Sequence, residues 1–262
     1  MHFKQGIELL EATMAFLAKK RGWACNFALG ICFSFTAFSS NLAAQEMFEP
    51  HMHLVPGGAA SPHVALTLDA CSGGTDMRIL NALIINEVPA TIFVTGRWIN
   101  SNPRAIALLN QNQDLFQIEN HGAAHVPAVI GSQRPYGIEP AGSSQAVLAE
   151  VTGGNLIIKL STPAHPHWYR GATALYTADA ISLIEQSGHR VAGFSLNADF
   201  GASASAQTTA TRISNAVDGD VIIAHINQPN RRSGSGVVVG ILALREKGFH
   251  FVRLDETEVL AD

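Results

Sequence analysis

The stretch His63–Asp76, HVALTLDACSGGTD, joins an apolar run to a loop built almost entirely from small residues. Val64–Leu68 is rich in β-branched and aliphatic side chains, which favour a buried strand. The run ends in a carboxylate, Asp69, and Ala70 to Gly74 after it carry little side-chain bulk. Glycines let the backbone turn sharply, and small side chains leave space for a ligand. The stretch therefore predicts a buried strand that delivers Asp69 to a site.

Strand-like runs recur along the chain and alternate with segments of helical period. The runs are residues 64–68, 90–96, 115–120, 167–170, 190–197, 220–225 and 249–254. Helical spacing is found between most of them, at residues 76–87, 178–188 and 237–248. This alternation is typical of a largely parallel sheet, and about seven such units make an open doubly wound sheet or an incomplete barrel. Periodicity leaves both architectures open. The Pro-, Gly- and Ser-rich loop 132–144 has the length of an active-site lid.

The composition is that of a globular protein. The chain has 262 residues, of which 47% are hydrophobic and 15% charged, with a net charge of -4. This balance gives no electrostatic case for nucleic acid or for a surface that collects anionic lipid. We therefore expect no nucleic-acid partner.

Residues 1–45 have the parts of a secretory signal peptide. Lys19–Arg21 precede an apolar stretch, residues 23–38, and the small residues after it offer a cleavage point after Ala44. The alternative is a retained N-terminal anchor, although the stretch is short for a transmembrane helix, which needs about 20 residues. We expect export to the periplasm or the extracellular space, with membrane contact only through an uncleaved N-terminal segment. Residues 46–262 then form the mature domain.

Cys71 is the only cysteine outside residues 1–45, so an exported chain has no disulfide partner for it. Its place two residues after Asp69 suggests either a nucleophile or a small buried residue beside a site. We expect the second, because no Cys–His pairing is suggested by the neighbouring sequence.

Five strand-like runs each end at or next to a residue with acid–base or charge chemistry. They are Asp69, His121, Arg170, Asp199 and His225. Ligands of parallel α/β sheets and barrels bind at the carboxyl ends of the strands, so we expect these side chains to share one site. His125 follows His121 by four residues. In a helical turn this spacing puts both imidazoles on one face, where both can bind one metal ion.

The ordered motifs resemble the polysaccharide deacetylases with a NodB-homology domain, carbohydrate esterase family 4. The family's first motif, T-F-D-D-G, is similar to TLDAC here, and its second, H-S/T-x-x-H, is similar to HGAAH. Its remaining three motifs are similar to YRGATALY, FSLNADFGA and VIIAH, at residues 169–176, 194–202 and 221–225. The resemblance runs from about Val64 to Leu254, and TLDAC in the first motif indicates a divergent branch.

The resemblance implies a distorted (β/α) barrel and metal-dependent removal of acetyl groups from N-acetylated sugars of a cell-wall or extracellular polysaccharide. It implies that residues 46–262 form the catalytic domain and that an acetylated glycan is the partner. The implied cofactor is a divalent metal ion, and we expect zinc. It also implies six roles: general base Asp69, general acid His225, orienting Arg170, supporting Asp199, and metal ligands His121 and His125.

Ala70 departs from the family, which has a second aspartate and metal ligand at this position. Because two histidines alone bind a divalent ion weakly, either another oxygen ligand substitutes or the site is degraded. We expect Asp76 or extra water as the substitute, since Gly73–Gly74 can fold the loop back toward the site. The competing prediction for Asp76 is a helix N-cap, which would point its carboxylate at backbone N–H groups. Ala70 also motivates an alternative function, a catalytically silent glycan-binding protein with this fold.

Overall fold

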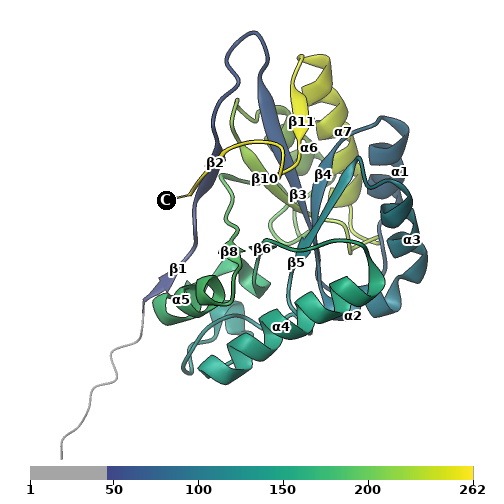
Figure 1. The fold of residues 1–262 in the computed structure, drawn as a ribbon. Helices are drawn as coiled ribbons and strands as arrows, with labels where there is room; N and C mark the ends of the chain where they lie inside the picture. The colour runs from purple at the N-terminus through teal and green to yellow at the C-terminus, as the bar shows by residue number, and fades with distance from the viewer. Residues whose placement is uncertain (1–45, 262) are drawn as a thin grey trace, which may run out of the picture. The chain divides into compact units, whose positions relative to one another are not determined.

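The computed structural model in Figure 1 describes residues 46–261. Its main sheet has eight strands, and all of their pairings are parallel. Seven of them follow the order β8 (Arg190–Val191), β6 (Trp168–Tyr169), β5 (Phe116–Asn120), β4 (Ala90–Val94), β3 (His63–Ala70), β10 (Val221–His225) and β9 (Leu196–Asn197). These seven curl into a half-barrel, so the predicted distorted (β/α) barrel of about seven strands is confirmed. The eighth strand, β11 (His250–Val252), pairs with the start of β3.

The remaining elements cover and extend this sheet. The helices are α1 (Met77–Ile85), α2 (Gly96–Ser101), α3 (Pro103–Gln111), α4 (Ser144–Ser161), α5 (Ala178–Gln186), α6 (Ala206–Ser214) and α7 (Ser233–Glu246). Short 3-10 turns are η1 (Pro135–Gly137) and η2 (Ala172–Ala174). Two small antiparallel pairs join β1 (Met47–Phe48) to β7 (Tyr176–Thr177) and β2 (Met52–Leu54) to β12 (Val259–Ala261).

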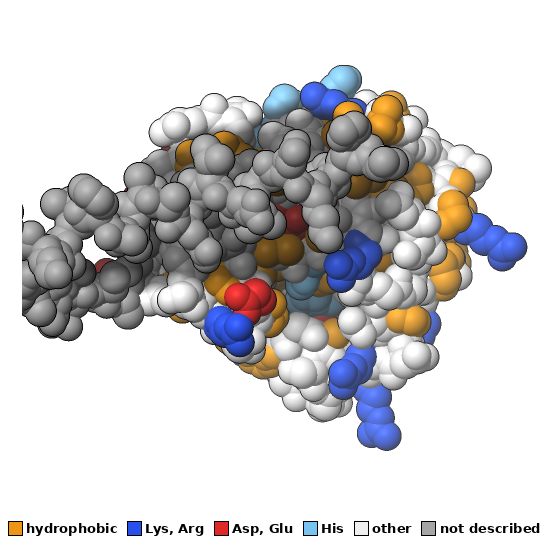
Figure 2. Space-filling view, turned by 90° about the horizontal axis from the view of Figure 1, so that it is seen from below, with side chains coloured by type: hydrophobic (Ala, Val, Ile, Leu, Met, Phe, Trp, Pro, Cys, Tyr) orange, Lys and Arg blue, Asp and Glu red, His pale blue; other side chains and the backbone are white. Residues whose placement is uncertain are grey.

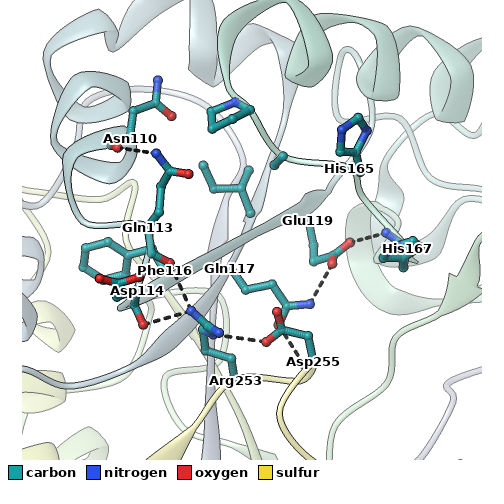
Figure 3. Close-up of a pocket in the computed structure, with 13 residues that line it drawn as sticks. Asn110, Gln113, Asp114, Phe116, Gln117, Glu119, His165, His167, Arg253 and Asp255 are labelled. Atoms are coloured by element: carbon teal, nitrogen blue, oxygen red, sulfur yellow. Dashed lines mark hydrogen bonds and ion pairs between the residues drawn. The ribbon is translucent and has the colours of Figure 1, made fainter.

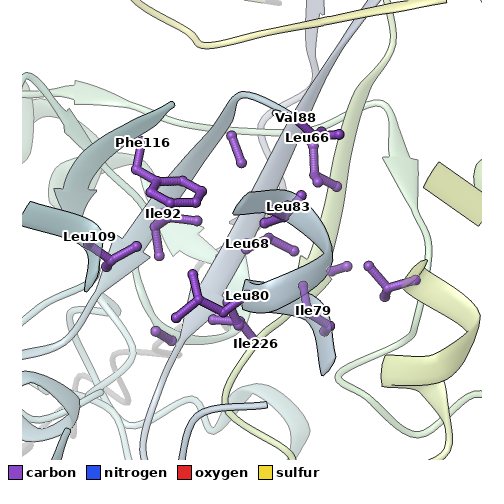
Figure 4. Packing of buried hydrophobic residues seen from close by; sticks show 14 of the residues in the cluster. Leu66, Leu68, Ile79, Leu80, Leu83, Val88, Ile92, Leu109, Phe116 and Ile226 are labelled. Atoms are coloured by element: carbon purple, nitrogen blue, oxygen red, sulfur yellow. The ribbon is translucent and has the colours of Figure 1, made fainter. Parts of the chain in front are cut away.

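The alternation of side chains along β3 separates the hydrophobic core from the interior of the half-barrel. Leu66 and Leu68 point outward and pack against Leu80 and Leu83 of α1 (Figure 4). Because successive residues of a strand face opposite sides, Ala65, Thr67 and Asp69 turn toward the barrel interior. The outward row buries apolar surface, and the inward row carries polar groups to the strand end.

The predicted strand 190–197 is wrong as a single element. Its ends form two strands on opposite edges of the sheet, because β8 pairs with β6 while β9 pairs with β10. The turn between them passes close to the backbone of Pro50. A Cβ added at Gly193 would lie 2.0 Å from the Pro50 carbonyl oxygen, so this crossing needs glycine. The chain thus spans the open side of the half-barrel at this point.

A buried carboxylate, Glu119 of β5, fixes the start of the two-residue strand β6. Its Oε2 accepts hydrogen bonds from the backbone N–H groups of His167 at 2.9 Å and Trp168 at 2.7 Å. Its Oε1 accepts a third from Gln117 Nε2 at 2.7 Å. Figure 3 shows Gln117, Glu119 and His167 at the wall of a cavity of about 360 Å³. The network holds β6 in place, and Arg170 follows directly after that strand.

We expect Glu119 to make stability depend on pH. Burial raises the pKa of Glu119 from 4.5 to about 7, against the hydrogen bonds from Trp168, Gln117 and His167, which lower it. The folded state therefore favours the neutral acid, and this contribution is complete below about pH 4.5 and lost as pH rises through about 7. The loss should reach at most about 3 kcal/mol. Urea unfolding of the wild type and of Glu119→Gln across this range measures it, and parallel pH curves for the two proteins would refute the assignment.

Within residues 46–261, no helix combines the length and apolar character needed to cross a membrane. The predicted signal peptide or anchor falls in residues 1–45, outside the described residues.

Candidate active site

The carboxyl ends of β3 and β10 bring acid–base side chains together. In the register of these strands Asp69 lies directly beside His225. Both line a cavity of about 510 Å³ together with Cys71, His121 and His125. Figure 2 looks onto this end of the sheet and shows histidine side chains within a hollow. The predicted gathering of strand-end residues is therefore observed.

The first pair at the site is the buried ion pair between Asp69 and Arg170. Arg170 Nη1 donates to Asp69 Oδ1 at 2.9 Å and to Thr67 Oγ1 at 2.9 Å. Its Nη2 donates to the carbonyl oxygen of Gly193 at 2.7 Å, and its guanidinium lies 4.2 Å from the ring centroid of Phe93. Arg170 is fully buried, so these contacts fix it firmly. The predicted position of Arg170 against Asp69 is observed.

The surrounding charges keep Asp69 ionised. Burial favours the neutral acid, but the positive charges of His121, Arg170 and His225 outweigh it and lower the pKa of Asp69. Asp69 Oδ1 is taken by Arg170, while Oδ2 lies 3.7 Å from His121 Nε2. A carboxylate with one fixed and one cavity-facing oxygen can accept a proton from a water or ligand.

The second pair joins His225 to Asp199, which lies just after β9. Asp199 Oδ1 lies 2.9 Å from His225 Nδ1, and Asp199 Oδ2 accepts the backbone N–H of His225 at 2.8 Å. Asp199 is fully buried and so sets the orientation of the ring, with Nδ1 held by Asp199 and the ring at the wall of the cavity. Burial disfavours the imidazolium, but Asp199 and Cys71 outweigh it and raise the pKa of His225 well above its usual range. A protonated His225 can donate to a leaving group.

The segment 121–125 is not the helical turn that its spacing predicts; that prediction is wrong. Its backbone is irregular, with φ of 90° at Gly122 and 64° at His125. Glu150 of α4 holds the loop, because its Oε1 accepts the N–H groups of Ala124 at 2.9 Å and Val126 at 3.0 Å. A Cβ at Gly122 would lie 2.4 Å from that oxygen, so glycine is needed where the family has a hydroxyl residue.

The two histidine rings meet despite the different backbone. Their centroids are 4.9 Å apart, with an interplanar angle of 63°. His121 Nδ1 lies 2.5 Å from the carbonyl oxygen of Arg170. Because a carbonyl only accepts, Nδ1 carries a proton, and Nε2 is the ring nitrogen that faces Cys71 and Asp69. The predicted convergence of His121 and His125 is thus observed.

Cys71 corrects the expectation that it lacks a histidine partner. Its Sγ lies 3.5 Å from His121 Nε2, and one donor atom each from Cys71, His121 and His125 lies within 4.8 Å of the others. Burial opposes ionisation, but His121, His125 and His225 outweigh it and lower the pKa of the Cys71 thiol well below its usual range. The histidines come from segments about fifty residues or more away in sequence, so no local pattern signals the pairing.

Asp76 is a helix cap, and the prediction that it ligates a metal is wrong. It is the N-cap of α1, where its Oδ1 accepts the backbone N–H of Arg78 at 3.1 Å. The Arg78 side chain occupies both carboxylate oxygens, with Nε 2.8 Å from Oδ1 and Nη2 2.5 Å from Oδ2. Asp76 also packs against α7, because a Cβ at Gly234 would lie 2.0 Å from its Oδ2. The capping geometry that α1 requires has turned this carboxylate away from the histidines.

A sequence comparison decides the family. The sequence model of the polysaccharide deacetylases matches residues 57–192, just over half of the chain. The chain belongs to the polysaccharide deacetylase family. The match spans the aspartate, histidine and arginine motifs. Beyond it, the fold brings His225 to the same cavity, with Asp199 buried behind it and bonded to its ring. Family membership assigns the chain to the hydrolases that act on amide bonds of acetylated sugars. No curated protein matches the chain.

Solved structures of family 4 carbohydrate esterases share the fold. A pseudoenzyme from Bacillus anthracis has a TM-score of 0.62 at 17% identity, over 78% of this chain and 67% of that one. A Bacillus subtilis esterase of the family has a TM-score of 0.61 at 17% identity, over 77% and 82%. One from Streptomyces lividans, solved with acetate, has a TM-score of 0.57 at 20% identity, over 72% and 91%. At these identities the likeness is one of fold.

Deacetylases of this family are generally metal-dependent, and the residues at the cavity fit a divalent ion. His121 and His125 offer imidazole nitrogens, and the Nδ1–H of His121 is held by a backbone carbonyl, as is usual for a metal-binding histidine. Within residues 46–261, the donor atoms of this group lie close enough to one another to bind a single ion.

Proposed function

We propose that the protein is an exported, metal-dependent deacetylase that removes acetyl groups from N-acetylated sugars of a cell-wall or extracellular polysaccharide. The observation that supports this most strongly is that two neighbouring strands each end in an acid–base side chain oriented by a fully buried charged partner. Asp69 is paired with Arg170 and His225 with Asp199, and the two reactive side chains face one cavity.

In this proposal Asp69 is the general base. Its ionised carboxylate is fixed by Arg170 at Oδ1, so Oδ2 takes a proton from the attacking water. His121 and His125 would hold the divalent ion, which when bound supplies polarisation of the amide carbonyl and a more acidic water. The new carbon–oxygen bond and the broken carbon–nitrogen bond give acetate and a free amine.

His225 is the general acid that completes the reaction. Its imidazolium gives a proton to the departing amine nitrogen, and the carboxylate of Asp199 stabilises that imidazolium and holds the ring toward the cavity. Asp69 and His225 lie on adjacent strands in register, so proton removal and proton delivery take place on the same acetamido group.

Ala70 favours a second candidate, a catalytically silent glycan-binding protein. The Bacillus anthracis relative of this fold is described as a pseudoenzyme, which gives that candidate a structural precedent. A binding protein has no need of a base and an acid that are each oriented by a buried charged partner. The two candidates therefore differ in whether acetate is released.

Acetate release from acetylated chito-oligosaccharides separates the two candidates. We expect the wild type to release acetate and free amine in equal amounts, and His225→Ala to reduce the rate by about 10²–10⁴-fold. His165→Ala, which removes a histidine from the cavity of Figure 3, is the matched control and should keep the wild-type rate. Oligosaccharide binding without acetate release by the wild type would support the silent alternative. A parallel assay on O-acetylated glycans tests whether the enzyme prefers amides over esters.

Export is the part of the proposal that concerns residues 1–45. Their positive flank, apolar stretch and small-residue segment support removal of a leader after Ala44. N-terminal sequencing of the protein recovered from the periplasm or the medium should give a chain that starts at residue 45. A cytosolic protein that still starts at Met1 or Met14 would rule out processing.

A further inference from the structure

We infer that Cys71 is a metal ligand of this site, so that one sulfur and the two imidazoles of His121 and His125 hold the ion. The inference rests on the metal dependence proposed above. Cys71 takes the place of the family's second aspartate, which would stand one residue earlier, where this chain has Ala70. It also replaces Asp76, whose carboxylate is occupied by Arg78 and the α1 cap.

The backbone at the end of β3 explains why position 71 takes this role and position 70 does not. Ala70 is fully buried in the hydrophobic cluster outside the half-barrel, together with Val94 and Trp98. Cys71, the next residue, lines the cavity. Thr95 fixes this direction. Its backbone N–H donates to the carbonyl of Ala70 at 3.2 Å, and its Oγ1 donates to the carbonyl of Cys71 at 2.5 Å.

The donor atoms already face one another. Cys71 Sγ lies 3.5 Å from His121 Nε2, and the group that includes His125 fits within 4.8 Å. Zinc bonds of about 2.3 Å to sulfur and about 2.0–2.1 Å to nitrogen place tetrahedral ligands about 3–4 Å apart. The three side chains therefore need only small shifts to bind one ion, and a tetrahedral ion would keep a fourth position for water or substrate.

The environment of Cys71 favours a ligand over a nucleophile. A thiol nucleophile needs only one imidazole as its base, and His225, held by Asp199, would be enough for that role. Cys71 is also grouped with two further imidazoles, and the Nδ1–H of His121 is committed to the carbonyl of Arg170, which leaves Nε2 to coordinate. Two further imidazoles beside the same sulfur have no role in activating a nucleophile, but they complete a set of metal ligands.

The sulfur ligand sets the choice of metal. Thiolate and imidazole donors select zinc or cobalt over magnesium, manganese and calcium, which prefer oxygen ligands. An aspartate at this point would have left the site more open to oxygen-preferring ions. We therefore expect zinc to bind much more tightly than magnesium or manganese.

Cobalt titration of the full-length protein tests the inference. A Cys25→Ser/Cys32→Ser background leaves Cys71 as the only thiol. Addition of Co²⁺ should produce a near-ultraviolet sulfur-to-cobalt absorption band, which Cys71→Ser abolishes. The same substitution should weaken zinc binding by at least about 100-fold. Even the loss of a residue that only hydrogen-bonds to a metal ligand lowers metal affinity by about 10–100-fold. Ser72→Ala, one residue further along the loop, should keep both the band and the affinity.

A second readout does not depend on the folding of a variant. Zn²⁺ should protect Cys71 of the same background protein from iodoacetamide, as measured by peptide mass spectrometry, and Mg²⁺ should not. Protein that binds cobalt without the sulfur band, or a Cys71→Ser variant with unchanged zinc affinity, would overturn the inference and leave the proposed deacetylase intact. A metal-bound protein that shows the band but releases no acetate supports the inference while the proposed function fails. Failure to bind any ion, or an acetyl thioester trapped on Cys71, overturns the inference.

Discussion

Replacing Asp69 by asparagine should lower the turnover of an N-acetylated oligosaccharide by about 10²–10⁴-fold. Asparagine keeps the shape of the side chain and an oxygen that can accept from Arg170 Nη1, but its amide cannot take a proton from water. Zinc content should stay close to that of the wild type, because Asp69 is not among the grouped donor atoms. Steady-state acetate release, with zinc measured on the same samples, checks both parts.

The control for this substitution is Asp218→Asn, the same chemical change at the other end of β3. Asp218 accepts the backbone N–H groups of Gly57, Gly58 and His63. Its loss should loosen the loop that leads into the strand without touching the cavity. Turnover by folded Asp218→Asn should match the wild type. Near-normal turnover by Asp69→Asn would remove Asp69 from the mechanism.

Replacing Arg170 by methionine should lower the free energy of unfolding by about 3–5 kcal/mol. Both charges of the pair are buried, so removal of the guanidinium leaves Asp69 in the interior without its partner. The donors to Thr67 and to the carbonyl of Gly193 are lost as well. Denaturant unfolding of purified protein measures the change.

A double-mutant cycle separates the charge effect from lost packing. Asp69→Asn in the Arg170→Met protein should recover part of the stability, because the buried carboxylate is then neutral. Arg190→Met is the matched control. Arg190 is exposed and its guanidinium lies 4.0 Å from the ring centroid of Trp168, so its removal should cost no more than about 1 kcal/mol. Strictly additive losses in the double variant would show that the ion pair is not what holds this site together.

The centre of the sheet was predictable because β3, β4 and β10 are short apolar runs, and α1, α5 and α7 because their apolar spacing is helical. The two edges were not, because β8 and β9 have only two residues each. Helix α4 was not predictable in this way. It carries two adjacent glycines, Gly153 and Gly154, which disfavour a helix interior. Tertiary packing explains them, since a Cβ at Gly154 would lie 2.3 Å from Asn120 Oδ1. The glycines let α4 approach the loop that carries His121, and Glu150 of the same helix shapes that loop.

The site was predictable where it depends on strand ends. Parallel strands finish at one edge of the sheet, so Asp69, Arg170, Asp199 and His225 had to come close once their strands were recognised. The loop after β3 was not predictable, because its direction depends on Thr95 and on the α1 cap. Those contacts turn Cys71 toward the histidines and Asp76 away from them. The chemical roles of these residues remain predictions.

Metal-dependent deacetylation is tested most directly by acetate release from an N-acetylated chito-oligosaccharide before and after zinc is restored to chelator-stripped protein. We expect no release above background from the stripped protein, and recovery of activity as one equivalent of zinc is added, with one free amine formed for each acetate. The same rate from fully stripped protein, or no release at any zinc concentration by protein shown to bind the metal, would contradict the proposed function.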